Sequence, residues 1–302
     1  MENKKTLPDL IRQTGAAVAV NEPMSKHTTF KVGGPAELFI SVSNTKQLSD
    51  ALSILNREQV PVLVTGRGSN LLVRDAGIKG AVIRLSEEFE QIRIEGKRVY
   101  CAGGAALSKL INKCCAAGLS GLEDLAGIPS SAGGAIAMNA GSFGSSIGEK
   151  VSKINAVSLN GTEESFDRTQ CGFGYRTSVF LLNELIICEA QLELEKADTQ
   201  KIKARIGLVL SQKAQTQPLK EASAGCIFKN PKGRSAGELI EKAGLKGLFA
   251  GGAKVSQLHA NYIVNTGGAK ASDIIELMEK LQRTVKERFL VDLEPEIKVV
   301  GH

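Results

Sequence analysis

Two glycine-rich segments of the chain have the composition of phosphate-binding loops. The first follows the apolar residues 61–65 and consists of Gly66, Arg67, Gly68, Ser69 and Asn70. Glycine lets the backbone approach a ligand closely, and consecutive backbone N–H groups form a nest that binds an anion. The competing interpretation is a tight turn between two strands, which the shape of this segment alone favours.

The first segment begins like the G-x-G-x-x-G signature of a Rossmann dinucleotide site. Leu71 stands at the position of the third glycine, which a Rossmann site needs so that its helix packs closely on the strand. No P-loop signature occurs in the chain either. The sequence therefore argues against both of these nucleotide-binding folds.

The second segment, residues 127–141, contains almost no bulky side chain. A core element needs bulk to fill its volume, so this composition is not typical of one. Ser130 and Ser131 lie near an expected helix start, where backbone amides suit a pyrophosphate. Close packing of a helix on a sheet also demands small residues, and both interpretations can hold together. Two such loops in one chain indicate a dinucleotide ligand.

The elements that must position these loops are short strands with a few helices between them. Apolar spacing predicts strands over 36–42, 61–65, 81–85, 98–102, 151–159, 162–166, 185–194 and 296–300, and helices over 45–58, 107–114, 201–212, 236–243 and 274–285. Asn44 or Thr45 is expected to cap the first of these helices. Asn160 and Gly161 predict a type I′ hairpin turn. This order of elements predicts an α+β protein and not a regular βαβ repeat.

Length, charge and aromatic content narrow the class of protein. A chain of 302 residues is expected to form two domains, or three small ones. The net charge of +6 is spread along the chain, which is typical of a solvated surface or of a bias toward anionic small molecules. Nucleic-acid binding is disfavoured, because tryptophan is absent and aromatic residues make up only 4%.

The cysteines and the N-terminus indicate a cytoplasmic protein. None of the six cysteines forms a C-x-x-C pair and only three histidines are present, so a metal site is not expected and the thiols are interpreted as reduced. Residues 1–10 have lysines but no apolar stretch behind them, unlike a signal peptide. No apolar run approaches the roughly 18 residues that a transmembrane helix needs.

Six segments together resemble the UDP-N-acetylenolpyruvoylglucosamine reductase family, in its shorter second type, over nearly the whole chain. They are residues 27–36 (HTTFKVGGPA), 66–73 (GRGSNLLV), 121–141, 171–178 (CGFGYRTS), 223–231 (SAGCIFKNP) and 293–297 (LEPEI). The glycine loops alone occur in a wider group of FAD-binding proteins. The combination, in this order, is highly specific.

The resemblance implies a two-subdomain FAD-binding fold of the vanillyl-alcohol-oxidase, or PCMH, type with a C-terminal α+β substrate-binding domain. We expect FAD-binding subdomains over 1–85, joined by the C-terminal strand 292–302, and over 86–214, and a substrate-binding domain over 215–291. The resemblance also makes the glycine loops an FAD site. The expected cofactor-binding residues are Gly66, Arg67, Gly68, Ser69, Asn70, Gly127, Ser130, Ser131, Gly133, Gly134, Asn139 and Gly141.

The resemblance further implies an activity in peptidoglycan precursor synthesis. Non-covalent FAD, reduced by NADPH, would reduce an enolpyruvyl UDP-amino sugar to UDP-N-acetylmuramate in a ping-pong cycle. The enzyme is expected to be a cytoplasmic monomer without nucleic-acid or membrane partners. In such a reaction the flavin supplies the hydride chemistry, and the protein supplies orientation and electrostatics.

By the resemblance, Arg176, Cys226 and Glu296 are catalytic. The planar guanidinium of Arg176 suits a carboxylate and would stabilise the enolate-like intermediate. Glu296 would polarise that intermediate or help to protonate it. Glu294 is a nearby alternative, interpreted as a solvated turn residue, and the family register selects Glu296.

Cys226 departs from the family pattern, because many members carry a serine whose hydroxyl donates the proton to carbon. A thiol can donate as well, since its reference pKa of about 8.5 makes it a stronger acid than a hydroxyl. Without the resemblance, a small buried cysteine would be the favoured interpretation. Ser223 is an alternative donor, although its offset in the sequence disfavours it.

Four further residues are expected to contact the substrate or the nicotinamide dinucleotide: Tyr175, Lys229, Asn230 and His259. Lys229 suits a phosphate, and Asn230 can both donate and accept hydrogen bonds. Tyr175 would order the Arg176 loop. His259 can equally be a core histidine.

Two alternative functions stay open at this point. Another FAD oxidoreductase of the same fold would often bind its flavin covalently through a loop histidine, but this loop has Asn70 and no histidine. A non-enzymatic nucleotide-sugar-binding protein would have lost Arg176 or Glu296, and both are present.

Overall fold

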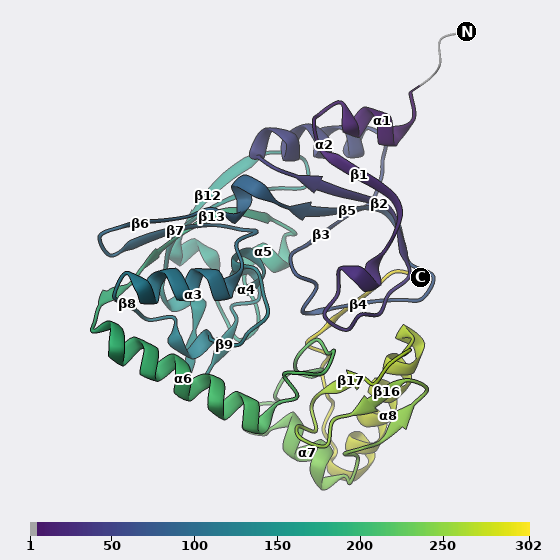
Figure 1. The fold of residues 1–302 in the computed structure, drawn as a ribbon. Helices are drawn as coiled ribbons and strands as arrows, with labels where there is room; N and C mark the ends of the chain where they lie inside the picture. Colours follow the sequence, from purple (N-terminus) through teal and green to yellow (C-terminus); the bar gives the residue numbers. More distant parts are fainter. Residues whose placement is uncertain (1–4) are drawn as a thin grey trace. The chain divides into compact units, whose positions relative to one another are not determined.

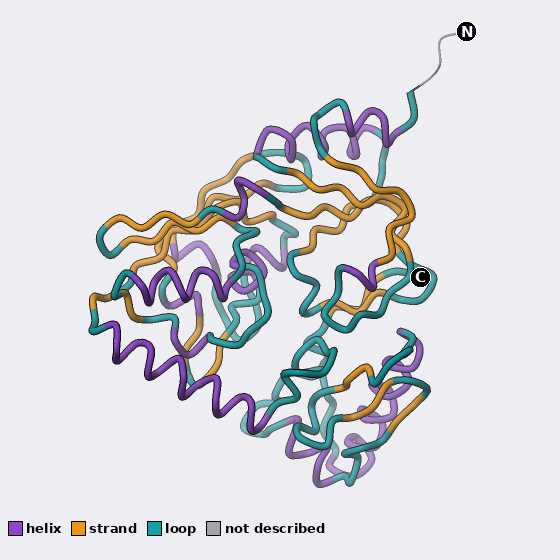
Figure 2. Tube along the Cα trace, in the orientation of Figure 1, coloured by secondary structure: helices purple, strands orange, loops and turns teal. Residues whose placement is uncertain are grey.

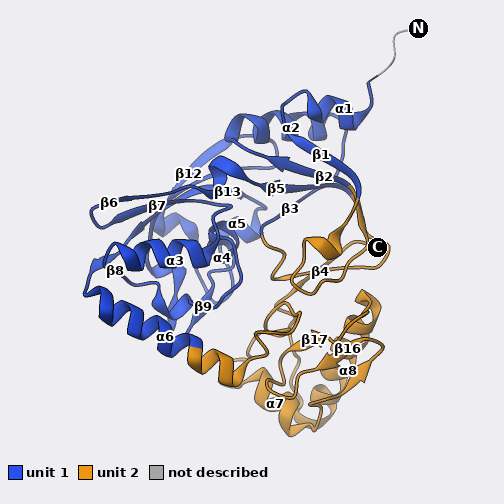
Figure 3. Ribbon diagram, in the orientation of Figure 1, with its two compact units in different colours: residues 1–21, 38–66, 80–210 blue, residues 22–37, 67–79, 211–302 orange. Residues whose placement is uncertain are grey.

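The computed structural model describes residues 5–302, so the first four positions of the expected subdomain 1–85 lie outside the described residues. Helices and strands follow one another irregularly along the chain (Figures 1 and 2), which confirms the predicted α+β class. The chain forms two compact units (Figure 3). Unit 1 comprises residues 1–21, 38–66 and 80–210, and unit 2 comprises residues 22–37, 67–79 and 211–302.

A four-stranded sheet begins the fold. Its strands are neighbours in the order β1 (Ala17–Pro23), β2 (Pro35–Val42), β5 (Ile78–Leu85) and β3 (Val62–Thr65). Helix α2 (Thr45–Arg57) is capped by Asn44, whose side chain accepts a hydrogen bond from the Gln47 N–H, so the structure selects Asn44 from the two predicted caps. Leu48, Leu52 and Leu55 form the buried face of α2, and they join the core of this part of unit 1.

A five-stranded antiparallel sheet forms the rest of the strand structure of unit 1. Its order is β12 (Glu163–Asp167), β11 (Val151–Val157), β13 (Ile186–Glu193), β7 (Arg98–Ala102) and β6 (Ile92–Glu95). The core of this part includes α3 (Leu107–Ala116) and α4 (Ala132–Ala137). Helix α6 (Thr199–Thr216) follows the last short strand of the unit.

The hairpin between β11 and β12 is confirmed, but the predicted type I′ turn is wrong. A type I′ turn needs positive φ at both central residues. Gly161 has φ +87°, whereas Asn160 is not among the residues with positive φ. The reason is a longer loop, in which Ser158 pairs with Thr162 and the Asn160 side chain accepts a hydrogen bond from the Thr162 N–H.

Unit 2 has a core of its own around two helices. The buried faces of α7 (Ala236–Lys242) and α8 (Ala271–Phe289) pack with a three-stranded sheet, β15 (Phe249–Ala250), β16 (Ala253–Val255) and β17 (Ile263–Asn265). The last strand, β18 (Lys298–Val300), pairs in parallel with β4 (Leu71–Val73). Both predicted helices and the predicted final strand are therefore present. The division of the chain into two FAD-binding subdomains (1–85 and 86–214) and a substrate-binding domain (215–291) stays a prediction. The structure divides the chain into two compact units.

The remaining elements are short. They are α1 (Leu7–Arg12), η1 (Met24–Lys26), η2 (Glu87–Glu90), β8 (Leu119–Ser120), η3 (Glu123–Leu125), β9 (Gly141–Ser142), β10 (Ser145–Ser146), η4 (Ile147–Glu149), η5 (Arg168–Cys171), α5 (Val179–Leu182) and β14 (Glu195–Lys196). Across residues 5–302, no helix combines the length and the apolar character needed to cross a bilayer. Within the same residues, no three His, Cys, Asp or Glu side chains are grouped to hold a metal ion.

Candidate functional site

The predicted site residues fall in both units. Unit 1 carries Gly66, Gly127, Ser130, Ser131, Gly133, Gly134, Asn139, Gly141, Tyr175 and Arg176. Unit 2 carries Arg67, Gly68, Ser69, Asn70, Cys226, Lys229, Asn230, His259 and Glu296. Arg176, which is suited to bind a carboxylate, thus belongs to unit 1, and Cys226, which is suited to donate a proton, belongs to unit 2.

The first glycine loop has the form of an anion-binding nest. Gly68 has the left-handed φ of +61°. Among the described residues, the backbone N–H groups of Arg67, Gly68 and Ser69 have no hydrogen-bond acceptor. Successive N–H groups around a left-handed residue are typical of phosphate sites. This stretch of backbone therefore fits the pyrophosphate of a dinucleotide such as FAD.

Gly68 also meets a second demand, close packing against residues 27 and 28. A Cβ at Gly68 would lie 2.0 Å from the carbonyl oxygen of His27 and 2.8 Å from the Cα of Thr28. Both of these atoms belong to the backbone, so they cannot move aside by a change of side-chain rotamer. A side chain at position 68 would therefore clash with them. The loop is thus held in its nest conformation by the chain's own packing, before any ligand binds.

We expect Gly68→Ala to lower the thermal stability more than Gly96→Ala. Gly96 has φ +64° but open space around its Cβ position, so both variants carry the same left-handed strain of about 1–2 kcal/mol. Only Gly68→Ala adds a backbone clash, and its Tm should be lower by at least about 2 °C. Differential scanning calorimetry of both variants measures this difference. Equal Tm values would contradict the packing role of Gly68.

The second glycine tract is largely committed to internal packing. The Ala132 N–H donates to the Ala105 carbonyl at 2.7 Å, and the Gly133 N–H donates to the Gly103 carbonyl at 2.8 Å. The Gly134 N–H donates to Ser131 Oγ at 3.2 Å, which caps α4. The first amides of this short helix are therefore already used. Close packing, the competing interpretation, accounts for the small residues here.

Gly66 shows how the two glycine segments depend on each other within unit 1. A Cβ at Gly66 would lie 2.3 Å from Ser131 Oγ, and a Cβ at Gly133 would lie 2.8 Å from the Gly103 carbonyl. Gly66 thus leaves room for the Ser131 side chain, and Gly133 lets the backbone of Gly103 approach closely. The small residues of both segments serve this local architecture, and the FAD contacts expected of Gly127, Ser130 and Gly141 stay predictions.

Asn139 links the second tract to the loop that carries the predicted catalytic arginine. Its Nδ2 donates to the Gly174 carbonyl at 2.8 Å, and its Oδ1 accepts a hydrogen bond from the Gly148 N–H at 3.0 Å. The residue is buried and has φ +43°. Its side chain is therefore engaged at both ends, and it holds residue 174 in place.

Arg176 occupies a strained position at the tip of this loop. Its φ of +56° is left-handed, which is uncommon for a residue with a side chain and is often found at functional sites. The loop is closed by the bridge between Gly174 and Thr177. Its Nη2 donates to the Gly141 carbonyl at 3.1 Å, and its Cζ lies 5.3 Å from the centre of the Tyr175 ring. The Gly141 carbonyl thus holds the guanidinium near the Tyr175 ring, and the ordering of the loop by Tyr175 stays a prediction.

In unit 2, one peptide segment brings the predicted acid and the predicted carboxylate together. The Ile227 N–H donates to the Asn261 carbonyl at 2.9 Å, and the Ile227 carbonyl accepts a hydrogen bond from the Glu296 N–H at 2.7 Å. Three chain segments therefore lie side by side at Ile227. Cys226 precedes this residue, Tyr262 follows Asn261, and Glu296 belongs to the third segment.

Asn261 fixes this arrangement from the inside. Its side chain is buried, its Nδ2 donates to the Phe228 carbonyl at 2.8 Å, and its Oδ1 accepts from the Phe228 N–H at 3.0 Å. These two hydrogen bonds pair with residue 228 as a neighbouring strand would. They leave neither the Asn261 amide nor the Phe228 backbone unpaired in the core. The family motifs did not point to Asn261, although a buried amide that spans two segments is a frequent structural device.

Tyr262 is the other residue that sequence reasoning missed. Its side chain is only 9% exposed, and Cys226 and Glu296 are its charged or ionisable neighbours. Burial, followed by the neighbouring Cys226 and Glu296, raises the pKa of the Tyr262 phenol well above its usual range. In the sequence this tyrosine precedes Ile263 and Val264, and no motif or predicted element includes it. No sequence signal marked it as a partner of Cys226.

Three of the four residues predicted to contact substrate lie in unit 2 and have partners there. Lys229 Nζ lies 2.5 Å from Glu294 Oε1, so the nearby alternative to Glu296 is an exposed ion-pair partner. Asn230 Oδ1 accepts a hydrogen bond from the Ala236 N–H at the start of α7. His259 Nδ1 accepts from the Asn261 N–H, and burial lowers its pKa. His259 thus supports the Asn261 segment, and substrate contacts of these residues stay predictions.

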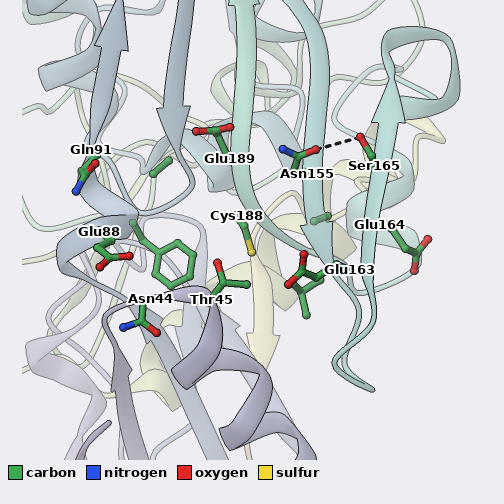
Figure 4. A pocket seen from close by; sticks show the side chains of 14 residues that line it. Asn44, Thr45, Glu88, Gln91, Asn155, Glu163, Glu164, Ser165, Cys188 and Glu189 are labelled. Carbon is green, nitrogen blue, oxygen red and sulfur yellow. Dashed lines mark hydrogen bonds between the residues drawn. The ribbon is translucent and has the colours of Figure 1, made fainter. Parts of the chain in front are cut away.

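A pocket in unit 1 does not coincide with any predicted site residue (Figure 4). Its lining includes Glu88, Glu163, Glu164 and Glu189 and no lysine, arginine or histidine. Negative charge on every side disfavours a dinucleotide or a nucleotide sugar. Cys188 lies among these side chains, and burial raises the pKa of its thiol to about 12, so this cysteine is not a reactive thiol.

Comparison with protein families matches two regions of the chain. Residues 217–300 match the C-terminal domain of UDP-N-acetylenolpyruvoylglucosamine reductase, and residues 36–166 match an FAD binding domain. The matched C-terminal region contains Cys226, Tyr262 and Glu296. The matched FAD region contains both glycine segments.

Full-length relatives align with almost the whole chain. The chain is 40% identical over 299 residues to the UDP-N-acetylenolpyruvoylglucosamine reductase of Bacillus subtilis (strain 168), and the alignment covers 99% of both proteins. The crystal structure of the UDP-N-acetylenolpyruvylglucosamine reductase of Thermus caldophilus is similar with a TM-score of 0.82 and 36% identity, over 95% of this chain and 99% of that one.

A more distant structure shares the fold alone. Cholesterol oxidase from B. sterolicum is similar with a TM-score of 0.51 and 15% identity, over 65% of this chain and 40% of that one. Together with the matched FAD domain, these similarities confirm the predicted FAD-binding fold of the oxidase type with an added C-terminal domain.

Proposed function

Because the chain belongs to the UDP-N-acetylenolpyruvoylglucosamine reductase family, we propose that it reduces the enolpyruvyl ether of a UDP-amino sugar, with FAD as cofactor and NADPH as reductant. The product is UDP-N-acetylmuramate, a precursor of peptidoglycan. The observation that supports this most directly is the close arrangement of Cys226 and Glu296 on either side of Ile227, because the reaction needs an acid beside a carboxylate.

Each predicted catalytic residue meets one demand of the reaction. FAD, when bound, supplies the hydride for the terminal enolpyruvyl carbon. Arg176 binds the substrate carboxylate and stabilises the negative charge that develops on it and on the neighbouring carbon. Cys226 donates its S–H proton to that carbon, and Glu296 polarises the intermediate. The nest at residues 67–69 holds the FAD pyrophosphate.

The proposal includes a cytoplasmic enzyme that acts as a monomer, without nucleic-acid or membrane partners. Lys229 gives up its ion pair with Glu294 to meet the substrate diphosphate, because the two negative charges of the diphosphate together attract the ammonium more strongly than one exposed carboxylate does. Asn230 and His259 complete the substrate contacts.

The proposed function is tested by the second half-reaction alone. We expect the purified protein to carry FAD that acid precipitation releases, because the loop has Asn70 and no histidine to bind flavin covalently. Enzyme photoreduced under anaerobic conditions should be reoxidised within seconds to minutes by the enolpyruvyl UDP-sugar. UDP-N-acetylglucosamine, which has no enolpyruvyl group, is the matched control and should leave the flavin reduced. Failure of both sugars to reoxidise the flavin would contradict the proposal.

A further inference from the structure

The hairpin of β9 and β10, residues 141–146, carries the backbone group that holds the predicted catalytic arginine. Its first residue, Gly141, provides the carbonyl that accepts the hydrogen bond from Arg176 Nη2 at 3.1 Å. Ser145 pairs with Ser142 across the hairpin. A Cβ at Gly141 would lie 2.6 Å from the Ser145 carbonyl, so the two strands are in close contact at this point. A group that fixes Ser145 therefore also restrains the Gly141 carbonyl.

Asp124, in the short helix η3, holds the second strand of this hairpin. Its Oδ2 accepts a hydrogen bond from the Ser145 hydroxyl at 2.9 Å. Its Oδ1 accepts a hydrogen bond from Arg205 Nε at 2.7 Å, and Arg205 Nη2 lies 2.5 Å from the same oxygen. Both carboxylate oxygens are thus engaged, and the side chain is only 21% exposed. An isolated surface ion pair contributes little, but a half-buried carboxylate with a charged partner and a hydroxyl partner has a fixed position.

Arg205, in helix α6, contacts the same hairpin at its tip. Its Cζ lies 5.8 Å from the centre of the Phe143 ring, where the ring attracts a cation. Phe143 and Gly144 form the tip, with left-handed φ angles of +52° and +85°. The ion pair of Arg205 with Asp124 therefore secures the hairpin both at its tip and along its second strand. All of these residues belong to unit 1.

We propose that Asp124 is a positioning residue, which anchors the hairpin 141–146 and so keeps the guanidinium of Arg176 in the orientation that a substrate carboxylate needs. This inference rests on the proposed function. The planar guanidinium forms two parallel hydrogen bonds with a carboxylate only over a narrow range of orientations. Without Asp124, the Gly141 carbonyl moves with a loosened hairpin. The charge of Arg176 then stays in the site, but its direction is no longer fixed.

Asp124→Ala, prepared as FAD-loaded enzyme, removes the anchor and leaves the predicted catalytic residues unchanged. Crystal structures of the wild-type enzyme and of this variant test the anchor directly. We expect Arg176 Nη2 to donate to the Gly141 carbonyl in the wild-type enzyme and to lose this hydrogen bond in Asp124→Ala. Asp50→Ala is the matched control and should keep the bond, because Asp50 is another aspartate of unit 1 with an ion-pair partner, Lys46.

Binding of two sugars separates positioning from a general loss of structure. Their affinities are measured by titrating the absorbance of the oxidised flavin. Asp124→Ala should bind the enolpyruvyl UDP-sugar about tenfold more weakly than the wild-type enzyme does, because its carboxylate meets a misdirected guanidinium. The affinity for UDP-N-acetylglucosamine, which has no carboxylate, should stay unchanged. In an Arg176→Ala background, Asp124→Ala should cost no further affinity, since the group that it orients is gone.

The inference is wrong if the hydrogen bond between Arg176 and Gly141 is the same in both crystal structures, or if Asp124→Ala weakens the binding of both sugars equally. A full effect of Asp124→Ala in the Arg176→Ala background would overturn it as well. If Asp124→Ala does not fold, Ser145→Ala, which removes only a hydroxyl, is measured in the same way. The proposed function fails separately: wild-type enzyme that the enolpyruvyl sugar does not reoxidise would disprove it, while the crystal structures would still decide whether Asp124 orients Arg176.

Discussion

Arg176→Ala is expected to retain its flavin and to reduce the rate of the sugar half-reaction about 10²- to 10³-fold, the loss typical for removal of one group that stabilises developing negative charge. The guanidinium is held by the Gly141 carbonyl and lies over the Tyr175 ring, so its fork is oriented before substrate binds. The reoxidation rate of photoreduced enzyme with the enolpyruvyl sugar measures the effect, and the ratio of FAD absorbance to protein measures retention.

Two control variants sharpen this expectation. Arg176→Lys keeps the charge but loses the planar fork, so it should recover only a part of the rate. Arg168→Ala removes an arginine from η5, a neighbouring element of the same unit, and should have the wild-type rate. A rate near wild type in Arg176→Ala, with FAD bound, would contradict the role assigned to Arg176.

Cys226→Ala is expected to slow the same half-reaction about 10²- to 10⁴-fold, the usual contribution of a general acid. Cys226→Ser should recover much of the rate, since a hydroxyl at this backbone position can also donate a proton. Cys188→Ala is the matched control, because Cys188 is likewise half-buried but lies in the glutamate-lined pocket.

Iodoacetamide offers an independent measure of the same role. Treatment should inactivate the wild-type enzyme in step with alkylation of Cys226, and the Cys226→Ser enzyme should resist. The assignment of the proton donor to the thiol would be wrong if Cys226→Ala retained the wild-type rate, or if inactivation followed alkylation of another cysteine.

The helices and most strands were predictable because their signals are local. Residues close together in the sequence define the apolar face of α2 and its Asn44 cap. The same holds for the apolar face of α8 and for the strands of the β11–β12 hairpin. The type of the hairpin turn was not predictable in the same way, because an Asn-Gly pair does not reveal where the two strands stop pairing.

The candidate site was predictable in its family motifs but not in its supports. Arg176, Cys226 and Glu296 could be located by resemblance, since each belongs to a motif. Asn261 binds the backbone of Phe228 across more than thirty positions of sequence, and no periodic pattern encodes such a contact. Likewise, whether the amides of α4 are open to a ligand depends on carbonyls at residues 103 and 105.

The peptide of Ile227 has a consequence for how this enzyme can vary. Its hydrogen bonds with the Asn261 carbonyl and the Glu296 N–H join main-chain atoms, so neither bond involves the side chain at residue 226. Sulfur can then replace oxygen at this point without disturbing the carboxylate opposite. The proton donor at position 226 can therefore change from one residue type to another, while the backbone that positions it stays the same.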